Sequence, residues 1–144
     1  PRQTGRYGMV IPTFARQALL GEDLTVYGDG KQTRCFAAVQ DVVPAMVKLM
    51  ESESICGEVF NIGNNEAVSM EDLAQRIIER TGSSSSIRYV PYDQAYGPGY
   101  EDMRHREPCL NKIHAAIGYR PAVSLDEILD AVIADTRRRL HQDV

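Results

Sequence analysis

Arg34 is the residue whose type and setting best suit the binding of an anion. It stands in the short segment Gln32-Thr33-Arg34-Cys35-Phe36, where strand alternation places it on the same face as Gln32 and Phe36. A guanidinium on a mostly apolar face needs an anionic partner, because a buried unpaired charge is costly. A diphosphate would match its forked donors, and a carboxylate of the fold would serve equally well. The spacing alone leaves both partners open.

A second basic group, Arg104-His105-Arg106, precedes Pro108 in a segment that also carries several acidic residues. Such a mixed run is typical of a solvated surface. The functional alternative is a loop that places Arg106 over an anionic ligand. Asp41, in contrast, is better explained as a helix cap than as a catalytic base.

The sequence contains no self-sufficient catalytic motif. Tyr27 and Lys31 have the spacing of a Tyr–Lys proton-transfer pair, but Gly28-Asp29-Gly30 between them predicts a turn, so the side chains need not share a helix face. The same glycines lack the third glycine of a dinucleotide-binding loop. Scattered histidines and three widely spaced cysteines form no ligand cluster. We therefore predict no catalytic, cofactor-binding or metal-binding residue in this chain.

Composition narrows the class of protein. The 144 residues carry a formal charge of −4, with 43% hydrophobic and 25% charged residues, which is ordinary for one globular domain. The negative balance argues against nucleic-acid binding, and no apolar run could span a bilayer. We expect a cytoplasmic protein with reduced thiols and no nucleic-acid or membrane partner. The N-terminus has neither Met nor a signal-peptide core, so we expect a piece of a longer protein.

Alternating helix and strand signals predict an α/β arrangement. Helices are expected over 12–20, 41–50, 70–81, 110–117 and from 125 to about 140, and strands over 24–27, 33–39, 59–63 and 87–90. The first two strands flank the glycine turn and are expected to form a hairpin or a strand–loop–strand. Asp41 and Ser69 are expected to cap their helices, Ser124 and Glu127 form a capping box, and 92–105 is expected to be a loop.

Seven segments, in a fixed order along the chain, resemble one family. They include V-Y-G-D-G-K-Q-T-R-C-F over 26–36, E-D-M-R-H-R-E-P over 101–108 and S-L-D-E-I over 124–128. Together they resemble the C-terminal half of an NAD-dependent nucleotide-sugar epimerase/dehydratase, an extended short-chain dehydrogenase/reductase. UDP-glucose 4-epimerases and UDP-glucuronate decarboxylases are enzymes of this kind. The resemblance covers nearly the whole chain.

The resemblance implies a division of the fold. Residues 1–144 would be a single C-terminal nucleotide-sugar-binding region: a substrate-binding lobe plus the last helix and strand of a Rossmann sheet, within 39–63. The N-terminal Rossmann core, with its NAD loop and catalytic Tyr-x-x-x-Lys, would lie upstream. The chain alone would then be inactive and bind no NAD. Its helix over 41–50 is apolar around most of its circumference, so we expect homo-oligomers through exposed apolar surface.

Position by position, the resemblance also implies substrate-binding residues. Val10 and Pro12 match the segment beside the nucleobase. Val26, Tyr27 and Gly28 match the strand whose backbone lines the base pocket.

Four further positions match polar residues of the family. Gln32 and Arg34 match the pair near the ribose and the diphosphate, Arg106 matches the second phosphate arginine, and Asp102 matches an acidic residue near the ribose or near that arginine. The implied reaction is transient oxidation of a UDP- or dTDP-sugar by NAD, followed by epimerisation, dehydration or decarboxylation. Two alternatives stay open: a non-catalytic nucleotide-sugar-binding module, and an oligomerisation fragment with no ligand.

Overall fold

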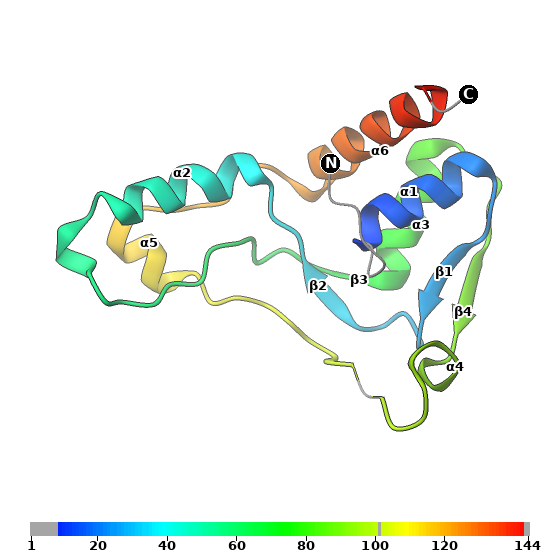
Figure 1. Ribbon diagram of the computed structural model, residues 1–144, viewed down its shortest axis with the longest axis horizontal. Coiled ribbons are helices and arrows are strands. Elements are labelled where there is room, and N and C mark those ends of the chain that lie inside the picture. Colours follow the sequence, from blue (N-terminus) through cyan, green and yellow to red (C-terminus); the bar gives the residue numbers. More distant parts are fainter. Residues whose placement is uncertain (1–8, 101, 143–144) are drawn as a thin grey trace.

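The computed structural model in Figure 1 describes residues 9–100 and 102–142 and has two packed regions joined by extended segments. In one region, helices pack against a pair of parallel strands; in the other, two helices lie side by side. The first contains α1 (Val10–Leu20), β1 (Leu24–Tyr27), α3 (Met70–Thr81), β4 (Ile87–Val90) and α6 (Leu125–Gln142). The second contains α2 (Val39–Met50), the short 3-10 helix η1 (Glu53–Ile55) and α5 (Asn111–Ile117). Strands β2 (Thr33–Cys35) and β3 (Ala67–Ser69) lie between them, and α4 (Tyr92–Tyr96) follows β4.

Both strand pairs join segments that are distant in the sequence. β1 pairs in parallel with β4, with Leu24 opposite Ile87, and β2 pairs antiparallel with β3, with Arg34 opposite Val68. The expected hairpin is therefore wrong and the strand–loop–strand alternative is right. Gly28 and Gly30 have positive φ, as the turn prediction requires. The turn directs the chain toward β3 rather than back along β1, and β2 ends at Cys35 instead of continuing to 39.

The main core lies between α1, α3, α6 and the inner face of β1. Its fully buried side chains include Phe14, Leu24, Leu73, Ile77 and Leu129. The pair at 73 and 77 has the i, i+4 spacing that places both side chains on one face of α3. The other predicted helices are confirmed with similar boundaries. Two differences are that the first helix begins at Val10 and not at Pro12, and that part of the loop expected after β4 forms the helix α4.

Helices α3 and α6 begin as the sequence predicts. The Ser69 Oγ accepts a hydrogen bond of 3.0 Å from the Asp72 N–H at the start of α3. At the start of α6 the Ser124 Oγ accepts from the Glu127 N–H at 3.3 Å, and the Glu127 carboxylate accepts from the Ser124 N–H at 2.8 Å. The Ser124 hydroxyl, which donates to the same carboxylate at 2.6 Å, and the Ser124 N–H hold the pKa of Glu127 below its usual value. The reciprocal bonds satisfy amide groups that a helix cannot satisfy internally.

Replacing Ser124 by alanine is expected to lower the free energy of unfolding by about 1 kcal/mol, because the first turn of α6 loses its capping hydroxyl. Urea denaturation followed by circular dichroism measures the change. Ser84→Ala is the control, because Ser84 is exposed and outside every helix. Equal effects of the two substitutions would show that the cap does not stabilise α6.

The second region has a small core of its own. Ala45, Ile113 and Tyr119 are buried there, and the Tyr119 hydroxyl donates to the Gly63 carbonyl at 2.7 Å. The segment over 59–63 was expected to be a strand, yet it makes no strand pairing within the described residues. A strand needs a neighbouring strand to receive its backbone hydrogen bonds, and the neighbours of this segment are the helices α2 and α5.

Asp41 does not cap α2, which corrects the sequence-based expectation. The N-cap is Ala38, and Asp41 lies in the first turn of the helix. Its carboxylate instead accepts hydrogen bonds from the backbone N–H groups of Ala122 at 3.1 Å and Val123 at 3.0 Å. Asp41 therefore ties the start of α2 to the segment that leads into α6.

One face of α2 is apolar and exposed. Val43, Met46 and Met50 expose 50%, 49% and 84% of their surface, and Val59 on the neighbouring segment exposes 81%. The opposite face packs against α5 through Ala45. The helix is thus buried on one side only, although its composition is typical of a helix covered on more than one side. No helix within 9–100 and 102–142 is long and apolar enough to cross a membrane.

Candidate functional site

A cavity of about 370 Å³ lies where the parallel strands β1 and β4 both end. Gly28 follows β1 directly, and its N–H donates to the Val90 carbonyl at 2.9 Å, which holds the two strand ends together. In Figure 1, α4 stands at this edge. Ligands of α/β proteins bind outside the carboxyl ends of parallel strands. The cavity is lined by Gly28, Asp29, Gln32, Tyr92, Tyr100, Asp102 and Arg104.

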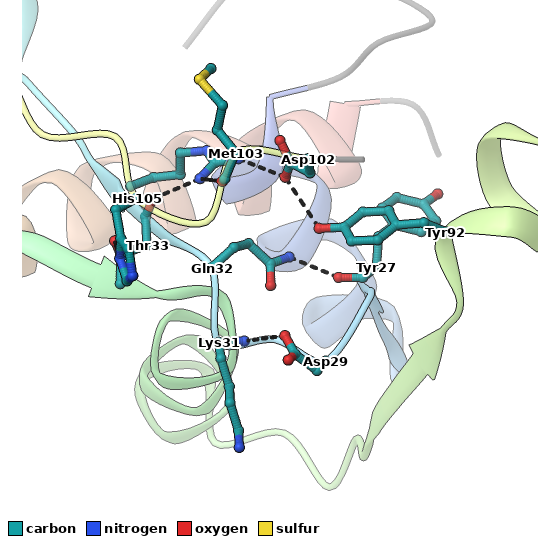
Figure 2. A network of polar contacts seen from close by, with 10 residues as sticks. Tyr27, Asp29, Lys31, Gln32, Thr33, Tyr92, Asp102, Met103 and His105 are labelled. Carbon is teal, nitrogen blue, oxygen red and sulfur yellow. Dashed lines mark hydrogen bonds and ion pairs between the residues drawn. The ribbon is translucent and has the colours of Figure 1, made fainter. Parts of the chain in front are cut away.

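Gln32 lines this cavity and carries a buried hydrogen-bond acceptor that is unpaired within the described residues. The residue is only 5% exposed, and its Nε2 donates to the Tyr27 carbonyl at 2.7 Å (Figure 2). That bond orients the amide, because a carbonyl can accept only from the nitrogen. The buried Oε1 has no hydrogen-bond partner within the described part of the chain. A buried acceptor without a partner costs about 1–3 kcal/mol, so the site favours a ligand that donates a hydrogen bond here.

Arg34 is paired with a carboxylate of the fold, one of the two partners that its sequence setting left open. Its Nη2 lies 2.6 Å from Asp102 Oδ2, and its Nη1 donates to the carbonyls of Thr33 at 2.7 Å and Met103 at 2.8 Å. Asp102 also accepts from the Tyr92 hydroxyl at 3.1 Å. The network connects β2, α4 and the segment after position 101 (Figure 2).

The residues of a second ion pair also line the cavity. Arg104 Nη1 lies 2.6 Å from Asp29 Oδ2, and the Arg104 carbonyl accepts from the Thr33 N–H at 2.8 Å. The Arg104 side chain and the backbone N–H of Lys31 lower the pKa of the Asp29 carboxyl. Both side chains of this pair are well exposed, so the pair is worth little to stability. The ion pair nevertheless holds the Arg104 side chain beside Asp29, and both residues line the cavity.

Tyrosine rings form the wall beside α4. The centroids of Tyr96 and Tyr100 are 4.4 Å apart in a stacked pair, Tyr92 and Tyr100 are 5.6 Å apart, and Tyr27 meets Tyr96 edge to face at 5.4 Å. Burial, followed by the charge of Asp102, raises the pKa of Tyr92 to about 12. The wall can therefore offer an aromatic surface and a neutral hydroxyl to a planar ligand.

The raised pKa of Tyr92 predicts a loss of stability in alkali. The folded state favours the neutral phenol, so its contribution is fully present below pH about 10 and is lost as the pH rises through about 12. Tyr92→Phe has no such group. Urea denaturation is measured at several pH values across this range. The difference in unfolding free energy between wild type and Tyr92→Phe should become smaller as the pH rises. A constant difference would contradict the prediction.

The structure brings together some of the predicted site residues and separates others. Gly28, Gln32 and Asp102 line the cavity, and Arg34 adjoins it through Asp102. Tyr27 contributes the carbonyl that holds Gln32.

The other predicted positions do not line this cavity within the described residues. Val10 and Pro12 belong to α1, and the side chain of Val26 is 1% exposed in the main core. Arg106 is exposed, and Arg104 occupies the place nearer to the cavity.

Sequence reasoning missed Asp29, Tyr92, Tyr100 and Arg104. The regular spacing of tyrosines at 92, 96 and 100 was a usable signal for an aromatic wall. No group of His, Cys, Asp or Glu among residues 9–100 and 102–142 is arranged to hold a metal ion.

The fold is that of part of an extended short-chain dehydrogenase/reductase. Residues 1–132 match the family described as GDP-mannose 4,6 dehydratase. The chain therefore belongs to that family of NAD-dependent epimerases and dehydratases, and the resemblance in its motifs is confirmed.

Relatives and solved structures agree with this assignment. A UDP-N-acetyl-alpha-D-glucosaminuronate decarboxylase of Bacillus cytotoxicus is 43% identical over 90% of this chain and 40% of its own length. The UDP-glucose 4-epimerase of Thermotoga maritima, solved with UDP-glucose, superimposes with a TM-score of 0.83 at 32% identity, over 97% of this chain and 43% of that one. The UDP-glucuronic acid 4-epimerase of Bacillus cereus, solved with UDP-glucuronic acid and NAD, gives 0.83 at 29% identity, over 96% and 42%. The chain thus spans about two fifths of these proteins.

Proposed function

We propose that this chain forms the nucleotide-sugar-binding part of an NAD-dependent epimerase, dehydratase or decarboxylase. The observation that carries the proposal is Gln32, which lines the cavity at the strand ends and whose buried Oε1 has no donor among the described residues. Similar proteins of known structure were solved with UDP-sugars, and the curated relatives are UDP-sugar decarboxylases. We propose that the catalytic residues, which decide between epimerisation, dehydration and decarboxylation, lie in another part of the longer protein.

The polarity of the cavity favours one orientation of the ligand. Gln32 Oε1 requires a donor, so we propose that it accepts from a hydroxyl or N–H of the nucleoside and not from a phosphate oxygen. The rings of Tyr92 and Tyr100 would lie against the nucleoside. Arg104, and the hydrogens of Arg34 that the fold does not use, would face the diphosphate. This contact set would orient the sugar through binding energy remote from the reacting carbon.

The glycine turn after β1 does not have the form of an NAD-binding loop. The Gly28-Asp29-Gly30 turn is followed by strand β2 and not by a helix, so it cannot present a helix N-terminus to a pyrophosphate. We propose that NAD is held by another part of the longer protein. In that case the chain alone, supplied with NAD and UDP-glucose, shows no turnover.

Arginine removal tests the proposed phosphate contact. Arg34→Ala is expected to weaken UDP binding by about 1.5–3 kcal/mol, as for loss of a charge-assisted hydrogen bond. Isothermal titration of UDP into the 144-residue chain measures the change, and Arg137→Ala, on the exposed end of α6, is the control. An affinity for UDP unchanged by Arg34→Ala would remove Arg34 from the site. A wild-type chain that does not bind UDP would overturn the proposed function.

We also propose that residues 39–63 belong structurally to the Rossmann layer of the longer protein, and that a second copy covers the exposed face of α2 when the chain is alone. The small core of this region is separate from the main core, and its outer face carries Val43, Met46 and Met50. Such a patch is unusual on a monomer.

Light scattering after size exclusion is expected to report a dimer or larger species. Val43→Glu combined with Val47→Glu should convert it to a monomer, because two charges would have to be buried in the contact. Lys48→Glu, which is exposed on the same helix, should leave the assembly unchanged. A monomeric wild type would contradict the prediction.

A further inference from the structure

Asp102 is the one residue in Figure 2 that joins two side chains from different elements. Its Oδ2 accepts both from Arg34 Nη2 at 2.6 Å, on β2, and from the Tyr92 hydroxyl at 3.1 Å, on α4. The side chains of Arg34 and Asp102 are 20% and 24% exposed, so the pair is well shielded from solvent. Breaking a shielded pair by removing one partner is costly, because the other charge is left without compensation.

Each of the two partners of Asp102 fixes one wall of the cavity. The Tyr92 ring lies so close over Gly28 that a Cβ added to Gly28 would lie 2.5 Å from Tyr92 Cε2. Arg34 donates to the Met103 carbonyl at 2.8 Å and so holds the segment after Asp102 against β2. A displacement of the Asp102 carboxylate would release both walls at once.

We propose that Asp102 is a positioning residue, whose carboxylate holds Arg34 and Tyr92 in the geometry that receives the ligand, and that it does not itself bind the ligand. The proposal rests on the proposed nucleotide-sugar binding. Its Oδ2 already accepts two hydrogen bonds, and a negative charge beside an anionic diphosphate would oppose direct binding. Because Asp102 holds the Arg34 guanidinium in one orientation, Arg34 loses little further side-chain entropy when a ligand binds.

The rival explanation is that the other carboxylate oxygen of Asp102 accepts directly from a ligand hydroxyl. A double-mutant cycle separates the two, because residues that act through one another give non-additive effects. UDP is titrated into wild type, Asp102→Asn, Tyr92→Phe and the double variant. Asp93→Asn is the matched control, since it makes the same chemical change on an exposed residue of α4.

If Asp102 acts by positioning, Asp102→Asn raises the Kd for UDP by about tenfold or more. The double variant Asp102→Asn/Tyr92→Phe should then bind UDP only slightly more weakly than Asp102→Asn, and Asp93→Asn should bind UDP like wild type. If the losses of UDP-binding free energy in the two single variants add up in the double variant, Asp102 contacts the ligand by itself, and the proposal is overturned. A wild-type Kd in Asp102→Asn overturns it as well.

A second readout needs no ligand. Tyrosine labelled with ¹³C at Cζ reports ionisation by NMR, and Tyr92→Phe assigns the signal of Tyr92. In Asp102→Asn the Tyr92 signal should titrate at lower pH than in wild type, because the phenol loses the negative neighbour, whereas Asp93→Asn should leave it unchanged. An unchanged titration overturns the proposal. If wild type binds no UDP, the proposed function fails, and this titration still decides whether Asp102 holds Tyr92.

Discussion

Replacing Gly28 by alanine is expected to abolish most UDP binding and to destabilise the chain by about 1–3 kcal/mol. The backbone at Gly28 has a φ of +73°, which L-residues adopt at a cost. The added Cβ would also lie 2.5 Å from the Tyr92 ring, so the ring must move out of the cavity wall. UDP titration and urea denaturation of the variant measure the two effects.

Gly21→Ala separates the two causes. Gly21 ends α1 with a nearly identical φ of +71°, but a Cβ there meets no atom within 4 Å among the described residues. The Gly21→Ala variant should therefore be less stable because of backbone strain, but it should keep the UDP affinity of wild type. If Gly21→Ala and Gly28→Ala lose UDP binding equally, the contact between Gly28 and Tyr92 does not shape the site.

Phe14→Ala is expected to have the largest effect on stability, lowering the free energy of unfolding by about 3–5 kcal/mol. Phe14 is 2% exposed at the centre of the main core, where it belongs to the cluster that joins α1, α3 and α6. Truncation leaves a cavity between helices whose backbones cannot close it without moving the strand pair. Urea denaturation measures the loss.

Arg16→Ala on the same helix is the control for Phe14→Ala. Arg16 is exposed, and its ion pair with Glu22 is 3.5 Å long, so the loss should stay within about 0.5 kcal/mol. Similar losses in the two variants would show that α1 does not supply the core.

Local signals predicted the helices and the turn because their causes are local. Ser69 and Gly82 mark the two ends of α3 through contacts within a few residues of the helix. The pairing of strands was beyond such signals. β2 and β3 are short and their partners are distant in the sequence, so local signals left a hairpin and a strand–loop–strand both open for 24–39, and only the second is right.

The distinction between local and long-range contacts also explains which residues of the site could be predicted. Gly28 and Gln32 were found because they belong to one specific motif around the turn. The aromatic wall was missed because Tyr92 meets Gly28 only after β1 and β4 have paired across the sequence. The resemblance placed Asp102 near the ribose or near Arg106, and its hydrogen bonds with Arg34 and Tyr92 became visible only in three dimensions.

The absence of any hairpin between β1 and β2 has a consequence for the order in which this chain folds. β1 and β4 are separated by α2, α3 and two strands, so their pairing must wait until a long loop has closed. Loop closure is an entropic cost that is met before the contacts form, and folding slows as contacting residues lie farther apart. α1 and α3 are nearly as far apart along the chain as β1 and β4, so the packing of these helices waits for the closure of a loop of similar length. We therefore expect the strand pair and the helical core to form together, and a growing chain that has not yet reached β4 would lack the strand ends at which the cavity lies.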